Sequence, residues 1–100
     1  MRIFLAEPNP RYDLKILEAH GPIKYVSINT INPFNIESCL TIMQQGLKTF
    51  DPATDYICMT GNLQTVAFMV MIAYSLFDTF RVLVFDARTS NYKERVIFHV

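Results

Sequence analysis

The sequence has few of the residues from which catalytic and metal sites are usually built. It contains three glycines, two histidines and two cysteines in 100 residues. Gly21, Gly46 and Gly61 lie far apart, which excludes a dinucleotide-binding fingerprint and a phosphate loop. His20 and His99 have no cysteine or histidine close to them in the sequence, so we expect no zinc site. The sequence therefore favours a non-enzymatic protein with no metal and no cofactor.

The two cysteines and the apolar segments also limit where the protein works. Cys39 and Cys58 lie in strongly apolar segments, which favours free, buried thiols in a reducing compartment. Burial raises the pKa of a thiol, so Cys58 is a poor candidate for a nucleophile. The apolar run at 66–76 is shorter than the roughly 20 residues of a membrane-spanning helix, and the first ten residues do not resemble a signal peptide. We expect a cytoplasmic protein.

Neither sign of charge is in excess. Nine Lys and Arg residues balance nine Asp and Glu residues, while 51% of the residues are hydrophobic. A neutral chain has no general attraction for nucleic acids or anionic membranes. A large apolar fraction without net charge instead favours a surface that is buried in a partner. We expect that partner to be a second copy of the chain, in a homodimer, or another protein.

The order of predicted elements indicates one α/β domain across residues 1–100. Apolar periodicity predicts strands at 2–6, 23–28, 56–60, 81–86 and 92–100, and helices at 11–20, 35–47 and about 63–80. Such alternation favours a three-layer, Rossmann-like (flavodoxin-like) fold with a mostly parallel sheet of about five strands. The link between the last two strands is too short for a crossover, which predicts an antiparallel hairpin at the carboxyl end.

Two of these elements have distinctive positions in the predicted fold. The strand at 56–60 has no polar face, so we expect it at the centre of the sheet. The third helix is apolar nearly all round, which predicts cover on more than one side and leaves room for a dimer interface.

Polar residues gather at the predicted carboxyl ends of the strands, where open parallel sheets bind their ligands. The candidate ligand-binding residues are Glu7, Thr60, Gly61, Asn62, Asp86 and Arg88. A nucleotide or a phosphorylated metabolite bound at these positions would make the protein a small-ligand sensor.

The Thr60-Gly61-Asn62 corner and the pair Asp86 and Arg88 also have purely structural interpretations, which the sequence favours. Gly61 permits unusual backbone angles, and Asn62 suits the cap of the following helix. The same helix terminus could instead receive a phosphate, with Arg88 adding charge. Asp86 and Arg88 could contact a ribose hydroxyl and an anion, or form an ordinary hairpin turn.

The last predicted strand carries a small group of charges. Lys93 and Arg95 share one face of this strand, whereas Tyr92 and Glu94 share the other. The cations form either a basic stripe or, as the favoured interpretation, a guard against pairing at an exposed strand edge. Binding of nucleic acid is therefore the third functional hypothesis, after protein binding and ligand sensing.

A pattern across most of the chain consists of Tyr12-Asp13, Ala19-x-Gly21, Asp55-x-Ile57-x-x-Thr60-Gly61-Asn62 and Leu83-x-Phe85-Asp86-Ala87-Arg88-Thr89-x-x-Tyr92. It resembles a group of small, uncharacterised proteins encoded by bacteriophages and mobile elements. The resemblance implies an accessory protein on a Rossmann-like half-fold in the host cytoplasm, and it assigns no catalytic residue. The missing Gly-x-Gly-x-x-Gly motif departs from true dinucleotide binders and argues against NAD or FAD.

Overall fold

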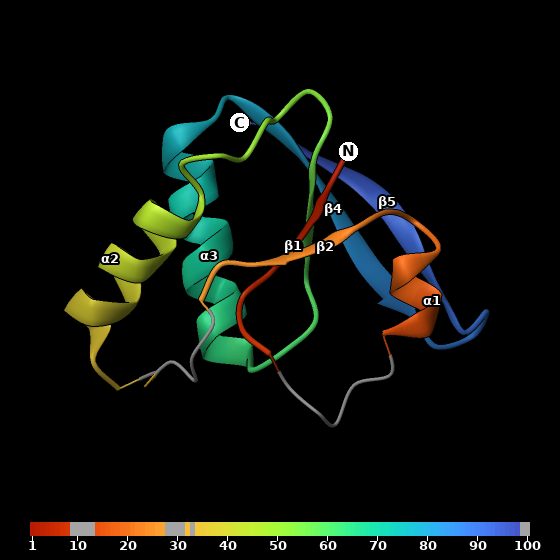
Figure 1. The fold of residues 1–100 in the computed structure, drawn as a ribbon, viewed down its shortest axis with the longest axis horizontal. Coiled ribbons are helices and arrows are strands. Elements are labelled where there is room, and N and C mark those ends of the chain that lie inside the picture. The colour runs from red at the N-terminus through yellow and green to blue at the C-terminus, as the bar shows by residue number, and fades with distance from the viewer. Residues whose placement is uncertain (9–13, 28–31, 33, 99–100) are drawn as a thin grey trace.

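The computed structural model describes residues 1–8, 14–27, 32 and 34–98 (Figure 1). The elements are β1 (Ile3–Leu5), α1 (Lys15–Glu18), β2 (Ile23–Tyr25), α2 (Ile36–Gly46), β3 (Tyr56–Cys58), α3 (Leu63–Leu76), β4 (Thr79–Asp86) and β5 (Asn91–Phe98). Parts of three predicted elements, at 11–13, 28 and 99–100, lie outside the described residues.

All five strands form one sheet in the order β2-β1-β3-β4-β5. The first four strands are parallel to their neighbours, and β5 is antiparallel to β4. The predicted α/β class, the mostly parallel sheet and the carboxyl-terminal hairpin are therefore confirmed. The central position of the strand at 56–60 is also confirmed, because β3 is the middle strand.

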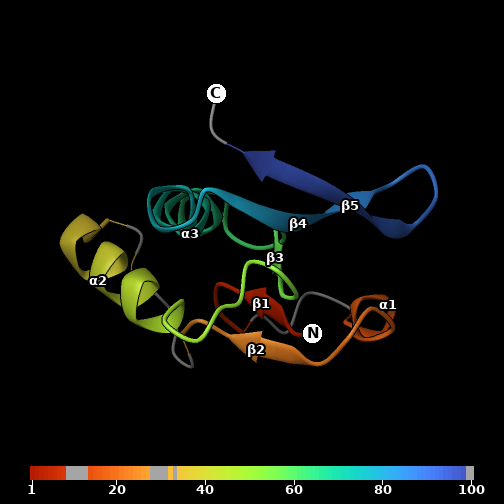
Figure 2. The same cartoon turned by 90° about the horizontal axis from the view of Figure 1, so that it is seen from above.

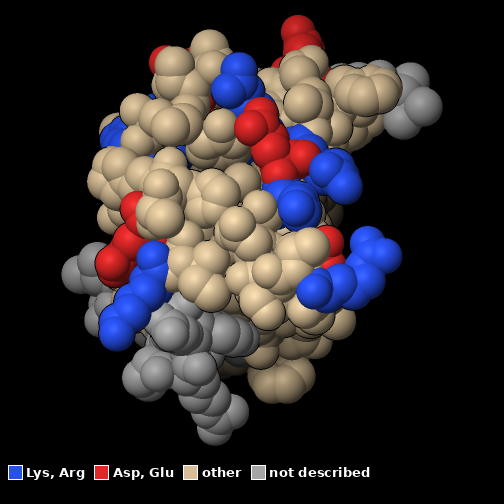
Figure 3. Space-filling model, turned by 90° about the vertical axis from the view of Figure 1, so that its right-hand side faces the viewer, with Lys and Arg blue, Asp and Glu red and all other residues tan. Residues whose placement is uncertain are grey.

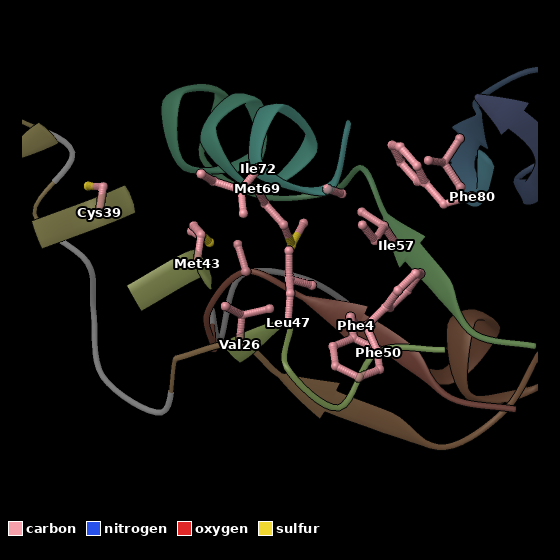
Figure 4. Close-up of a cluster of buried hydrophobic side chains, with 13 residues drawn as sticks. Phe4, Val26, Cys39, Met43, Leu47, Phe50, Ile57, Met69, Ile72 and Phe80 are labelled. Atoms are coloured by element: carbon pink, nitrogen blue, oxygen red, sulfur yellow. The ribbon is translucent and has the colours of Figure 1, made fainter. Parts of the chain in front are cut away.

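The helices cover the two faces of the sheet unequally. Seen from above, α2 and α3 lie on one side of the sheet and α1 lies on the other (Figure 2). We call the side of α2 and α3 the covered face and the side of α1 the open face. On the covered face, Phe4, Ile57 and Phe80 of the strands pack with Met43 of α2 and Met69 of α3 (Figure 4). This cluster is the larger part of the core.

A second cluster fills the open face close to α1. Leu17 of α1 is fully buried there, and it packs with side chains from the strands. These side chains are Ile3, Leu5, Tyr56, Cys58, Leu83 and Tyr92. Since α1 has only four residues, its cover does not extend along the full length of the hairpin.

The third helix ends earlier than its apolar pattern predicts. The pattern runs to Phe80, but α3 ends at Leu76, and the backbone N–H of Phe77 donates to the carbonyl of Ala73. Thr79 and Phe80 instead begin β4, where they pair with the end of β5. The prediction of helix to Phe80 is wrong because pairing with a distant strand decides the conformation of these residues, which apolar periodicity cannot detect.

The buried side of α3 faces the sheet and α2, so its cover on more than one side agrees with the prediction. Its outer side nevertheless exposes Met71 and Leu76, each at about half of its full area. Both cysteines, Cys39 and Cys58, are free and buried. The apolar surplus of the sequence is thus divided between the core and the surface.

Hydrogen bonds of Asp55 link the beginning of β1 to the segment that enters β3. Its carboxylate is 2% exposed and accepts the backbone N–H groups of Arg2 and Asp51, each at 2.8 Å. The guanidinium of Arg2 donates to the same carboxylate at 3.0 Å. Burial alone would raise the pKa of Asp55, but these hydrogen bonds and the charge of Arg2 outweigh it and lower the pKa.

Candidate functional site

The carboxyl edge of the sheet is the place where an open parallel sheet offers a ligand site. The chain leaves β1 toward β2 on one side and leaves β3 toward β4 on the other, so the strand order reverses between β1 and β3. Glu7 follows β1, and Thr60 follows β3. The register pairs Ile3 with Tyr56, which places Glu7 and Thr60 at the same level of adjacent chain segments. Glu7 is half-buried and engaged in an interaction.

The Thr60-Gly61-Asn62 corner has the contacts of a helix cap. Gly61 has φ +141°, a conformation that residues with a Cβ rarely adopt. The side-chain oxygen of Asn62 accepts the backbone N–H groups of Gln64 at 3.0 Å and Thr65 at 3.4 Å. These are amides that an anion would need at the start of α3. The geometry therefore supports the structural interpretation, because a phosphate would have to displace the Asn62 side chain from them.

Thr60 belongs to a small polar group on the open face that the sequence did not single out. Its hydroxyl donates to the hydroxyl of Tyr92 at 3.3 Å. The Tyr92 ring also makes an edge contact with His20, with ring centres 6.2 Å apart, and His20 lies 3.2 Å from the side-chain oxygen of Asn91. Burial raises the pKa of the neighbouring Cys58 thiol despite hydrogen bonds with Thr60 and Tyr92. A protonated, buried thiol is not a nucleophile.

Asp86 and Arg88 lie in the turn between β4 and β5. The Asp86 carboxylate accepts the backbone N–H of Arg88 at 3.0 Å and faces its guanidinium nitrogen Nε at 3.4 Å. The carbonyl of Asp86 also accepts the backbone N–H of Thr89. These are the contacts of a hairpin turn, and they leave the Arg88 side chain 92% exposed.

The candidate residues separate into two groups. Asp86 and Arg88 line a groove of about 490 Å³ together with Val84, Phe85, Ala87, Lys93 and Arg95. Glu7 and the Thr60-Gly61-Asn62 corner do not contribute to this groove. The structure therefore brings Arg88 together with Lys93 and Arg95. The sequence could have suggested this grouping from the predicted hairpin, but not the separation from Asn62.

A larger groove of about 660 Å³ lies at the opposite, amino edge of the sheet. Its lining residues come from the segment before β3, the end of α3 and both strands of the hairpin: Pro52, Ala53, Leu76, Phe77, Asp78, Thr79, Arg81 and Val96. This groove was not predicted from the sequence. Its only signal was the polar pair Asp78-Thr79 after a long apolar run, which marks the end of α3.

The open face next to this groove carries exposed apolar side chains beside charged ones. Figure 3 shows Lys, Arg, Asp and Glu side chains in separate groups, with a broad uncharged surface between them. On β5, Val96 is 51% exposed and Phe98 is 65% exposed. The charged side chains here are Arg81 and Glu94, which approach each other to 3.8 Å and are each nearly half exposed.

The described part of the chain holds no group of three or more His, Cys, Asp and Glu residues that could bind a metal ion. Among the same residues, no helix has both the length and the hydropathy needed to cross a membrane.

Comparison with protein families gives a match over nearly the whole chain. The family model described as phage Pam3 gp32-like protein matches residues 4–98. No curated protein and no solved structure matches the chain. Of the described helices and strands, the matched range leaves out only Ile3, the first residue of β1, so nearly the whole domain carries the family's sequence pattern.

Proposed function

The chain belongs to the phage Pam3 gp32-like protein family, and we propose that it acts in the host cytoplasm as an accessory protein that forms a homodimer and binds protein. The observation that carries this proposal is the incomplete cover of the open face. Beyond α1, the hairpin exposes Val96 and Phe98 at 51% and 65% of their full areas. Apolar side chains grouped in this way favour burial against a partner.

The surface that we assign to the dimer surrounds the groove at the amino edge, and we call it the docking surface. It consists of Leu76, Asp78, Arg81, Val96 and Phe98. The first four line the groove, and Phe98 lies beside it because it pairs with Thr79, another lining residue. Apolar side chains from a helix end and from a strand thus meet at one place.

The charges of the docking surface favour a second copy of the chain as its occupant. A two-fold dimer interface is built from the same patch twice, so the patch must complement itself. The docking surface carries one carboxylate, Asp78, and one guanidinium, Arg81. A two-fold axis between them brings each Asp78 to the other copy's Arg81. The chain has no net charge, so no overall repulsion separates the two copies.

The molecular mass in solution tests this proposal. Light scattering is expected to give twice the chain mass of 11.6 kDa. Val96→Asp would place a charge in the middle of the docking surface, and we expect it to yield a monomer. Ile36→Asp is the matched control, since Ile36 is similarly exposed, at 56%, but lies on α2. A monomeric wild-type chain, or an equal loss of dimer in the control, would contradict the proposal.

A charge exchange tests the predicted contact across the interface. Asp78→Arg and Arg81→Asp each place like charges opposite one another, and each is expected to weaken the dimer. The double exchange restores opposite charges and should recover the dimer. Circular dichroism of each variant separates loss of the dimer from loss of the fold. A double variant that dimerises no better than the single ones would remove the Asp78–Arg81 contact from the proposal.

A small-ligand sensor at the Thr60-Gly61-Asn62 corner is the alternative function, and it has less support. The side chain of Asn62 already occupies amides that would hold an anion. Arg88, the proposed second contact, lines the groove of about 490 Å³, to which this corner does not contribute. A thermal-shift screen against nucleotides and phosphorylated metabolites tests the alternative, because a ligand at 100 times its dissociation constant raises the stability by about 2.7 kcal/mol.

A further inference from the structure

Positive charge is concentrated at the turn end of the β4–β5 hairpin, although the protein has no net charge. The groove of about 490 Å³ is lined by three cations, Arg88, Lys93 and Arg95, and by one carboxylate, Asp86. One third of the nine Lys and Arg residues in the chain therefore line a single groove. This end of the hairpin is opposite the docking surface, since Asp86 pairs with Asn91 while Thr79 pairs with Phe98.

The alternation of side chains along β5 produces this separation of charge. In the sequence, Glu94 stands between Lys93 and Arg95, and in a flexible segment its carboxylate would offset one of their two charges. In a strand, successive side chains point to opposite faces. Glu94 accordingly lies on the open face, where it accepts a hydrogen bond from the Tyr56 hydroxyl at 3.1 Å. Lys93 and Arg95 remain together on the other face without that carboxylate.

The cations keep most of their donors available. Within the described residues, the ammonium of Lys93 has no hydrogen bond or ion pair. In the same described part of the chain, the Arg95 guanidinium donates only to the backbone carbonyl of Glu94, at 2.8 Å. The register places two valines, Val84 and Val82, opposite Lys93 and Arg95. Lys93 and Arg95 therefore stand beside apolar neighbours, whereas Asp86, the carboxylate in the groove lining, contacts Arg88 in the turn.

The arrangement suits a chain of phosphates better than a single one. Lys93 and Arg95 occupy alternate positions of an extended strand, which separates them by about 7 Å, and Arg88 continues beyond them in the turn. Cations in a row face successive anions, whereas a single phosphate is held best by donors that converge. We propose that this groove binds the backbone of a single-stranded nucleic acid, with Val84 and Phe85 as apolar surface for the sugars and bases. The proposal is independent of the proposed dimer.

Salt dependence of binding to a fluorescein-labelled oligothymidylate tests the site. Each phosphate contact on a single strand contributes about 0.7 to the slope of log affinity against log salt. Three contacts predict that anisotropy titrations give about 20-fold weaker binding at 200 mM than at 50 mM salt. Lys93→Ala with Arg95→Ala leaves one contact, so binding should be weaker at low salt and should fall only about 3-fold over the same range.

A matched double variant controls for the loss of two charges. Lys15→Ala with Lys48→Ala removes the same charge from exposed positions outside the groove, and its salt slope should equal that of the wild type. Equal weakening in both double variants, or no binding at low salt, overturns the proposal. Competition by ATP as effective as that by unlabelled strand also overturns it, in favour of a mononucleotide. If the Lys93 and Arg95 variant forms larger species while its affinity for the strand is unchanged, the two cations only guard the edge of β5.

Discussion

The covered face and the open face of the sheet use the same strands but receive different amounts of helix. Of the described helices, α2 and α3, with 11 and 14 residues, pack on the covered face, while α1, with four residues, packs on the open face. The hairpin reflects this difference. Phe80 and Val82 of β4 are 0% and 1% exposed on the covered face, whereas Val96 and Phe98 of β5 are more than half exposed.

The difference follows from the order of the strands. Crossovers between parallel strands are right-handed, so the direction in which the chain moves across the sheet decides which face its helix covers. Among the described elements, only the connection from β1 to β2 runs toward the β2 edge of the sheet, and the helix that it carries, α1, is short. The chain then continues from β4 into β5 by a hairpin, which carries no helix. An exposed apolar surface at the far end of the open face is therefore a consequence of topology, and four predictions test this comparison.

The same substitution on the two faces is expected to have the largest difference in effect. Phe80→Ala would leave a cavity among fully buried neighbours and should lower the free energy of unfolding by about 3–5 kcal/mol. Phe98→Ala should lower it by only about 0.5 kcal/mol in the monomer. Urea unfolding at a protein concentration where light scattering reports monomer measures both. Similar losses for the two variants would show that the open face is buried in a single chain.

Asp55 links the segments that enter β1 and β3 at the amino edge of the sheet, and its replacement is expected to have the second-largest effect on stability. Asp55→Ala would leave the backbone N–H groups of Arg2 and Asp51 without an acceptor, at a cost of about 2–3 kcal/mol. Because the pKa of Asp55 is lowered in the folded protein from its ordinary 3.8, the ionised carboxylate stabilises the fold above that pH. This stabilisation is lost as the pH falls through the lowered pKa.

Urea unfolding between neutral and acidic pH measures this contribution of Asp55. The wild type should lose stability below about pH 4, and Asp55→Ala should lose less of it. Glu37→Ala, which removes an exposed carboxylate of α2, is the control and should retain the acid sensitivity. Identical pH profiles for the wild type and Asp55→Ala would exclude the predicted role.

Gly46 tests how closely α2 approaches the covered face. A Cβ at this position would lie 2.3 Å from a methyl group of Val26 and 2.7 Å from its carbonyl oxygen. Gly46→Ala should therefore destabilise the protein by about 1–3 kcal/mol, although alanine favours a helix by about 1 kcal/mol over glycine. Thermal unfolding measures the change, and Thr41→Ala on the exposed side of α2 is the control. A stabilised Gly46→Ala variant would mean that α2 can move away from β2.

The smallest expected effect concerns the cap of α3. Asn62→Ala removes an acceptor for two backbone N–H groups and should cost about 1 kcal/mol, while Asn62→Asp should retain the cap. The short helix on the open face has no such device, since Leu14 provides no side-chain hydrogen bond at the start of α1. Thermal unfolding of both variants compares them with the wild type. No loss in Asn62→Ala would remove the cap as the explanation for the Thr60-Gly61-Asn62 corner.

Much of the fold could be predicted because its signals are local. Apolar periodicity located α2, Asn62 marked the start of α3, and the short link predicted at 87–91 indicated a hairpin. The end of α3 could not be predicted in this way. Phe80 continues an apolar helical pattern, but in the structure it pairs with β5 in the sheet. A window of neighbouring residues contains no information about that pairing.

The candidate site was predicted less well, for a related reason. The sequence placed Asn62 and Arg88 at the same edge of the sheet, and both do follow strands that end there. It could not show that the Asn62 side chain turns back to its own helix, or that Arg88 lies over the hairpin beside Lys93. The position of a strand end is a property of the chain order, whereas the direction of a side chain depends on its contacts.

The sequence by itself determined the α/β class, the hairpin, the free buried cysteines and the lack of a dinucleotide fingerprint, because each depends on residue type or on short-range spacing. Only the tertiary structure decided which face of the sheet lacks cover and which charges share a groove. Both depend on strand order and register, which join residues far apart in the chain. In Lys93-Glu94-Arg95, the two cations share a groove on one face and the carboxylate lies on the other, because strand geometry sends neighbouring side chains to opposite faces.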